Sequence, residues 1–237
     1  VVRRAIEAYR LGRENDELRP RIGDDTSLFG FSPVIAHVRQ IIDKVAPTGS
    51  RVLITGPSGS GKEIVARLLH ARSRRAPHSF VAINAATMAP GRMETELCGT
   101  EASSSGPRKV GVFEQAHGGT LFLDEVAEMP IETQSKILRV LVDQTFERVG
   151  GGPKVKVDVR VVSSSSRDLN EEIGKGRFRE DLFHWLNVVP IQVPPLAARR
   201  EDIPLLVEYF MTQISKATGL PPRRISEDAM AALQAHD

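Results

Sequence analysis

Short apolar runs alternate along much of the chain with segments that have helical periodicity. Four of these runs have the length and the branched residues typical of buried strands, and they lie at Arg51–Thr55, Ser79–Asn84, Thr120–Asp124 and Val157–Ser163. Strands that alternate with helices predict a doubly wound, mostly parallel sheet, so we expect an α/β fold. Two further runs, Thr145–Val149 and Lys154–Asp158, flank a glycine-rich turn and predict a β-hairpin.

The pattern changes towards both ends of the chain. Val1–Arg19 has helical spacing, and Pro20 ends that predicted helix. After the proline-rich passage Val189–Pro195, helices are predicted at Asp202–Lys216 and Ser226–Gln234. We therefore expect three parts: a linker helix at 1–25, an α/β subdomain at 26–195, and the beginning of a small helical subdomain at 196–237.

The composition narrows the class of protein without identifying a reaction. Hydrophobic residues make up 41% and charged residues 26%, which is typical of a soluble globular protein. A net charge of +2 provides no strong general attraction for nucleic acid. The single cysteine, Cys98, permits no internal disulfide, and no apolar run is long enough to cross a bilayer. We expect a cytoplasmic protein without a membrane partner.

A glycine-rich segment between a predicted strand and a predicted helix has the most specific chemistry. Its residues are Gly56, Pro57, Ser58, Gly59, Ser60, Gly61 and Lys62. Glycines allow the backbone N–H groups to converge on phosphates, the helix N-terminus adds positive potential, and Lys62 adds a charge. We expect ATP or GTP here. The alternative is a turn without ligand, with Lys62 as a surface charge.

Two adjacent carboxylates follow the predicted strand Thr120–Asp124. The carboxyl ends of parallel strands meet at one edge of the sheet, so Asp124 and Glu125 are expected beside the phosphates. Asp124 is suited to Mg²⁺, through water, and Glu125 to the activation of a water molecule. The alternative, a solvated turn, is disfavoured by the phosphate-binding loop upstream.

The chain resembles the AAA+ central domain of bacterial enhancer-binding proteins, which are NtrC-family response regulators that act on sigma-54 RNA polymerase. The resemblance runs from about Leu28 to the C-terminus. It rests on ordered segments at Gly56–Glu63, Phe80–Asn84, Gly118–Glu125, Phe146–Gly150, Val157–Arg160 and Gly176–Leu182. Because glutamate regularly follows the loop lysine in that family, Glu63 is expected in the nucleotide site, and the C-terminal helices are expected to form the beginning of an AAA+ lid.

The resemblance also implies roles for residues outside the loop. Asn84 matches the partner that restrains Glu125, although an asparagine at a strand end also has ordinary hydrogen-bonding uses. Arg179 matches an arginine finger that reaches the ATP of a neighbouring subunit. Ser166 stands where the family has the asparagine that orients the attacking water, and a hydroxyl is expected to form a weaker hydrogen bond there.

Two positions depart from the family pattern. The Gly-Ala-Phe-Thr-Gly-Ala loop that grips sigma-54 is missing, since Ala102–Val110 is rich in Ser, Gly and Pro and has no aromatic anchor. Trp185 stands where the family has a second finger arginine. The missing loop, together with the segments Gly99–Glu101, Ile83–Ala86 and Lys136–Gln144, resembles the NtrX-type branch of the family, whose members are paired with NtrY sensor kinases.

The resemblance implies a receiver domain before Val1, on which the sensor kinase NtrY acts, and a helix-turn-helix domain for DNA after Asp237. We expect a homo-oligomer, either a dimer or a ring, in which ATP or ADP with Mg²⁺ controls assembly and hence promoter binding. Two alternatives are an ATPase that remodels RNA polymerase through another surface, and a scaffold that holds nucleotide without using it.

Overall fold

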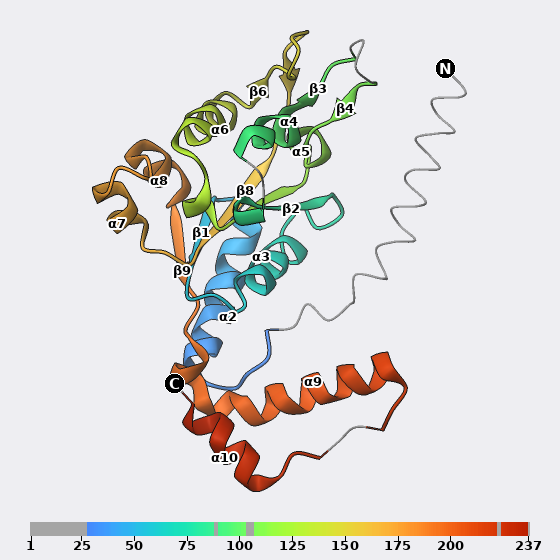
Figure 1. The fold of residues 1–237 in the computed structure, drawn as a ribbon, viewed down its shortest axis with the longest axis vertical. Coiled ribbons are helices and arrows are strands. Elements are labelled where there is room, and N and C mark those ends of the chain that lie inside the picture. Colours follow the sequence, from blue (N-terminus) through green and yellow to red (C-terminus); the bar gives the residue numbers. More distant parts are fainter. Residues whose placement is uncertain (1–27, 88–89, 103–106, 222–223, 237) are drawn as a thin grey trace.

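The computed structural model describes residues 28–87, 90–102, 107–221 and 224–236 (Figure 1). The linker helix expected at 1–25 lies outside the described residues. A five-stranded sheet with the order β2-β5-β8-β1-β9 forms the centre, and neighbouring strands are parallel throughout. The α/β fold is therefore confirmed. The strands are β1 (Val52–Thr55), β2 (Phe80–Asn84), β5 (Thr120–Asp124), β8 (Arg160–Ser165) and β9 (Val189–Gln192).

One strand was not expected from the sequence. β9 lies in the passage whose prolines had indicated a break, and it pairs only with β1. An edge strand tolerates Pro190 because one side of its backbone needs no partner in the sheet. β8 also begins later than predicted, at Arg160 rather than Val157.

Helices cover both faces of the sheet, because alternate residues of each strand point to opposite sides. Val52 and Ile54 of β1 pack with the buried sides of α2 (Pro33–Val45) and α3 (Lys62–Ala71). Leu53 of the same strand belongs to the second core, on the other face. The helices of that face are α4 (Met93–Cys98), α5 (Val112–Gln115), α6 (Ile131–Asp143), α7 (Leu169–Gly174) and α8 (Glu180–Leu186).

Two small antiparallel pairs lie outside the main sheet. β6 (Thr145–Phe146) pairs with β7 (Val155–Lys156), which confirms the expected hairpin in a shorter form. β3 (Gly99–Thr100) pairs with β4 (Lys109–Val110). Short 3-10 turns connect the larger elements: η2 (Ala46–Thr48), η3 (Ala85–Thr87), η4 (Pro90–Arg92) and η5 (Val126–Glu128).

Beyond β9 the chain leaves the sheet and forms a helical end, which lies below the α/β body in Figure 1. It consists of the turn η6 (Leu196–Asp202), α9 (Ile203–Thr218) and α10 (Glu227–Ala235). Ser226 begins α10 by accepting a hydrogen bond from the Ala229 N–H, as the sequence predicts. Among the described residues, no helix combines the length and apolar character needed to cross a bilayer.

Candidate nucleotide-binding site

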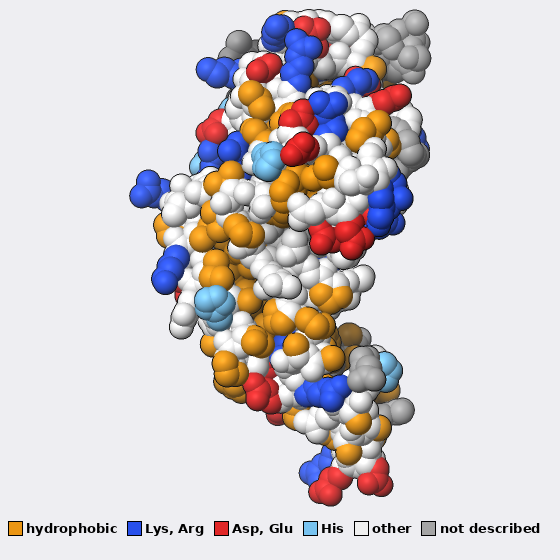
Figure 2. All heavy atoms as spheres, turned by 90° about the vertical axis from the view of Figure 1, so that its left-hand side faces the viewer, with side chains coloured by type: hydrophobic (Ala, Val, Ile, Leu, Met, Phe, Trp, Pro, Cys, Tyr) orange, Lys and Arg blue, Asp and Glu red, His pale blue; other side chains and the backbone are white. Residues whose placement is uncertain are grey.

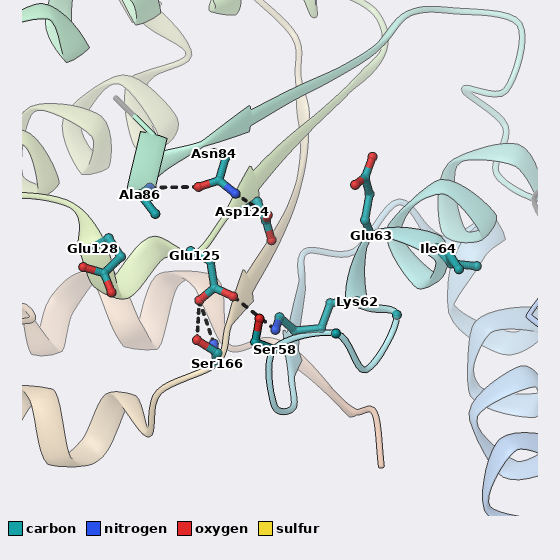
Figure 3. Close-up of a pocket in the computed structure, with 12 residues that line it drawn as sticks. Ser58, Lys62, Glu63, Ile64, Asn84, Ala86, Asp124, Glu125, Glu128 and Ser166 are labelled. Carbon is teal, nitrogen blue, oxygen red and sulfur yellow. Dashed lines mark hydrogen bonds and ion pairs between the residues drawn. The ribbon is translucent and has the colours of Figure 1, made fainter. Parts of the chain in front are cut away.

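The carboxyl edge of the sheet collects most of the residues that the sequence singled out. Register places Asn84 of β2 directly opposite Asp124 of β5, and β8 lies on the other side of β5. The loop after β1 closes the site from the next strand (Figure 3). A cavity of about 610 Å³ opens there, lined by Ser58, Gly59, Gly61, Lys62, Glu63, Ile64, Asn84, Ala86, Asp124, Glu125, Glu128 and Ser166.

The loop backbone depends on glycine. Gly56, Gly59 and Gly61 have φ angles of +152°, +76° and +101°, a region that other residues rarely adopt. A Cβ on Gly56 would lie 2.4 Å from the Val193 carbonyl oxygen. Gly61 immediately precedes α3, so the unpaired N–H groups of that helix face the cavity. The loop therefore has the shape of an anion cradle, as phosphate binding requires.

Lys62 is buried at the bottom of the cavity, with only 6% of its side chain exposed. Its Nζ lies 3.1 Å from Glu125 Oε1 and donates to the carbonyl oxygens of Gly56 and Pro57. The alternative in which Lys62 is a surface charge is therefore wrong. A buried ammonium needs a partner of opposite charge, and Glu125 provides it within the chain.

Glu125 is held from several directions. Its backbone is in the left-handed region at φ +52°, and its amide donates to Ser164 Oγ. Oε2 accepts hydrogen bonds from the amide of Ser166 at 2.9 Å and from its hydroxyl at 2.7 Å. Burial by itself raises the pKa of Glu125, but the hydrogen bonds from Ser166 and Lys62 outweigh it and leave the pKa below its ordinary value.

Asp124 is bound by residues on both neighbouring strands. Asn84 Nδ2 donates to Oδ2 at 2.8 Å, and the Ser164 hydroxyl donates to Oδ1. This contact differs from the expected one between Asn84 and Glu125. The reason is register: Asn84 lies opposite Asp124, and Glu125 turns towards Ser166 instead. Ser164 was missed because the serine run of β8 contains no motif of its own.

The carboxylates and hydroxyls at this edge fit a magnesium ion. Mg²⁺ prefers oxygen ligands and is commonly held by one or two carboxylates together with phosphate oxygens. Asp124 and Glu125 line the cavity and supply such oxygens. Glu63 also lines it, but its carboxylate pairs with Arg67 at 2.7 Å and points away from Lys62 in Figure 3. Asp124 is thus better placed for a metal than Glu63.

Arg179 lies outside this cavity. It precedes α8, and its guanidinium forms a two-bond ion pair with Asp181 at 2.6 and 2.9 Å. Trp185, near the end of α8, is half-buried against the core, and the Arg51 guanidinium stacks over its ring at 4.1 Å from the centroid. Within one chain the structure therefore assembles the phosphate loop, the carboxylates, Asn84 and Ser166, but not Arg179.

The phosphate loop between β1 and α3, the carboxylates after β5 and the helices beyond the sheet define a AAA+ P-loop NTPase domain. Two family comparisons agree with this class. Residues 28–192 match the sigma-54 interaction domain, and residues 197–237 match the AAA+ ATPase lid domain. The chain belongs to the sigma-54 interaction domain family of AAA+ proteins. It is similar over its whole length to regulators named NtrX.

Individual relatives support this placement. The chain is 56% identical over its whole length to the nitrogen assimilation regulatory protein NtrX of Azorhizobium caulinodans, and 41% identical over 98% of its length to NtrC of Escherichia coli. The crystal structure of Brucella abortus NtrX with ADP is 61% identical, covers the whole chain and has a TM-score of 0.87. The chain spans 52%, 50% and 53% of these proteins, or about half their length.

Proposed function

We propose that the chain binds ATP and ADP at Gly56–Lys62, and that this binding controls its assembly with further copies of itself. The supporting observation is the charge of the cavity. Lys62 is the one cation among the described residues that line it, against the carboxylates of Glu63, Asp124, Glu125 and Glu128. A bound triphosphate with Mg²⁺ would therefore be neutralised only in part within one chain, and a cation from a neighbouring copy would complete the neutralisation.

Arg179 is the cation that we assign to the neighbouring copy. It is 41% exposed, and its ion pair with Asp181 is a surface pair of the kind worth about 0–1 kcal/mol. Such a pair exchanges readily for a more strongly charged phosphate partner. Figure 2, which views the side that carries α7 and α8, shows apolar and charged side chains mixed on this face.

The relatives support nucleotide binding and extend the proposal. Brucella abortus NtrX has been solved with ADP and with ATP. Because this chain spans about half of such proteins, we infer that it is the central domain of an NtrX-type response regulator in the cytoplasm. The parts outside the match would receive the signal of a sensor kinase such as NtrY and bind promoter DNA, with nucleotide-driven assembly raising DNA affinity.

Activation of sigma-54 through a Gly-Ala-Phe-Thr-Gly-Ala loop has no support in this chain. Residues 102–110 contain no aromatic side chain that would anchor a partner. We therefore propose a regulatory AAA+ module, with residues 26–195 as its nucleotide-binding part and 196–237 as the beginning of its lid. RNA polymerase remains a partner only under the ATPase alternative.

That alternative, an ATPase that remodels RNA polymerase, is favoured by the carboxylate pair Asp124 and Glu125. Both oxygens of Glu125 are engaged, however, by Lys62 on one side and Ser166 on the other. Glu125 can orient a water molecule only after Lys62 has moved to the phosphates. We accordingly expect slow hydrolysis, with Glu125, Asp124, Asn84, Ser166 and a neighbouring Arg179 in its machinery.

Sedimentation in the presence of ATP, ADP or no nucleotide tests the proposal on wild type, Lys62→Ala and Arg179→Ala. Wild type should assemble with ATP. Lys62→Ala should lose both nucleotide binding and assembly, whereas Arg179→Ala should bind nucleotide and remain dispersed. Arg139→Ala, which removes an exposed arginine on α6, is the matched control and should behave as wild type. Identical assembly of every sample with and without ATP would favour the idle scaffold instead.

A further inference from the structure

A buried cluster outside the phosphate cavity joins three parts of the chain that are far apart in sequence. It contains the loop before α2, the underside of the phosphate loop, and the turn η6 that leads into α9. Its central residues are Arg199, which is 7% exposed, and Asp202, which is 1% exposed. Charged side chains are rarely buried to this extent without a specific partner.

Arg199 connects the helical end to the phosphate loop. Its Nη2 donates to the Ser60 carbonyl oxygen at 2.9 Å. Two side-chain atoms at this junction, Arg199 Nε and Ser60 Oγ, are buried without a hydrogen-bond partner. Arg199 is also the one residue inside η6 with non-helical backbone angles, φ −141° and ψ 45°. The backbone kink and the two unpartnered atoms mark this junction as strained and incompletely hydrogen-bonded.

Asp202 connects the same turn to the loop before α2. Oδ1 accepts from the amides of Phe31 at 2.6 Å and Ser32 at 2.9 Å, and Oδ2 accepts from the Ser32 hydroxyl at 2.6 Å. A Cβ on Gly30 would lie 2.5 Å from Oδ2, so the loop passes directly over this carboxylate. Burial raises the pKa of Asp202, but these hydrogen bonds and the Arg199 charge outweigh it and lower the pKa overall, which keeps Asp202 ionised.

The segment between β9 and η6 is closely packed against the phosphate loop. The Val193 amide donates to the Thr55 carbonyl oxygen at 2.7 Å, which extends β9 to the start of the phosphate loop. The Val193 carbonyl oxygen in turn fills the space beside Gly56. The phosphate loop thus contacts residues 193–202 at two positions, Gly56 and Ser60, which provides a direct physical connection between the loop and that segment.

Resting on the proposed nucleotide binding, we propose that Arg199 is a positioning residue that shapes the phosphate loop through Ser60 and couples its occupancy to α9. Arg199 is not among the described residues that line the phosphate cavity. It holds the loop carbonyl outward, so that the amides of the loop face the cavity. When phosphates order the loop, the bond to Ser60 tightens, and Asp202 carries the change to the first turn of α9.

The test combines binding of a fluorescent ADP with hydrogen exchange of the chain, with and without saturating ADP. In wild type, ADP should slow exchange in both the phosphate loop and α9. In Arg199→Met, ADP affinity should fall about tenfold or more, since a charge-assisted hydrogen bond is lost. At saturating ADP the loop should still be protected, while α9 exchanges as in the nucleotide-free protein.

Arg200→Met is the matched control, because Arg200 is the exposed neighbour and the change in charge is the same. It should bind ADP and protect α9 as wild type does. If Arg199→Met melts before the measurement, Arg199→Lys carries the test, with several-fold weaker binding and reduced protection of α9 expected, because a lysine lacks the guanidinium geometry.

The outcomes separate the two proposals. A wild-type chain that binds no ADP would overturn the proposed function and this inference together. ADP binding without protection of α9 in wild type would overturn the inference alone. The same conclusion follows if Arg199→Met, or Arg199→Lys in its place, retains wild-type affinity and wild-type protection of α9.

Discussion

The carboxyl edge of the sheet and the start of α8 differ in how far their ion pairs are shielded from water. At the edge, buried Lys62 pairs with the partly buried Glu125, and Asp124 accepts hydrogen bonds from both neighbouring strands. At the start of α8, the Arg179 guanidinium pairs with Asp181, two residues along the chain, and both side chains are exposed. The charged side chains of the edge thus find their partners within one chain, whereas Arg179 can exchange its exposed partner at little cost.

This difference indicates that a single chain supplies the phosphate loop and the carboxylates of the nucleotide site, but not its arginine finger. Buried pairs are costly to break, because each partner loses its water and then its counter-charge. Exposed pairs lose little when they separate. The phosphate site is therefore expected to persist in a single copy, while the contribution of α8 depends on a second copy. Four substitutions test that contrast, from the largest expected effect to the smallest.

Gly56→Ala should cause the largest loss of stability among the four substitutions. The new Cβ would meet the Val193 carbonyl at 2.4 Å, at a φ of +152°, so the unfolding free energy should fall by about 3 kcal/mol. Nucleotide binding should be lost as well. Gly59→Ala is the control, since its Cβ meets nothing within 4 Å and only the φ of +76° costs about 1 kcal/mol. Urea unfolding measures the free energy of unfolding of both variants. Equal losses in the two would contradict close packing of the loop against Val193.

Glu125→Gln should destabilise the chain by about 2 kcal/mol at pH 7, because Lys62 stays buried without its counter-charge. The folded pKa of Glu125 is lowered, so its contribution is present above the unfolded pKa of about 4.3 and is lost as pH falls through the folded pKa. The difference between the two proteins should therefore shrink below pH 4.3. Urea unfolding from pH 7 to pH 3 measures it, and a constant difference would argue against the ion pair.

Trp185→Arg tests whether a second cation on α8 strengthens ATP-driven assembly. Loss of the stack with Arg51 and of core contact should cost about 1 kcal/mol, while the added cation should let ATP-driven assembly occur at lower nucleotide concentration. Arg51→Met removes the stack without adding a charge and serves as control. Unfolding and sedimentation are measured together. Assembly no stronger than that of Arg51→Met would show that a charge at 185 does not reach the neighbouring site.

Asp181→Asn should have the smallest effect on stability, within about 0.5 kcal/mol, because the pair that it removes is exposed. Freed from this partner, Arg179 should promote ATP-driven assembly at several-fold lower protein concentration. Asp143→Asn, which removes the exposed partner of Arg139 on α6, is the control and should change neither property. Unchanged assembly of Asp181→Asn would mean that Asp181 does not restrain the finger.

Much of the fold was predictable because its information is local. The apolar runs gave β1, β2 and β5 within one residue, and the glycines of the phosphate loop require a strand before them and a helix after them. Edge strand β9 was not predictable in the same way. Its proline argues against a strand in general, and only its place beside β1 makes Pro190 acceptable.

For the site, the sequence by itself determined which chemical groups are present: the loop Gly56–Lys62, the carboxylates Asp124 and Glu125, and the absence of an arginine at 185. Only the tertiary structure decided which of them touch. Strand register makes Asp124, rather than Glu125, the hydrogen-bond partner of Asn84. Ser164 of β8 donates a second hydrogen bond to Asp124. The turn before α9 places Arg199 within hydrogen-bonding distance of the Ser60 carbonyl oxygen. The physical reason is that motifs follow local backbone geometry, whereas hydrogen bonds between distant segments depend on strand register and packing.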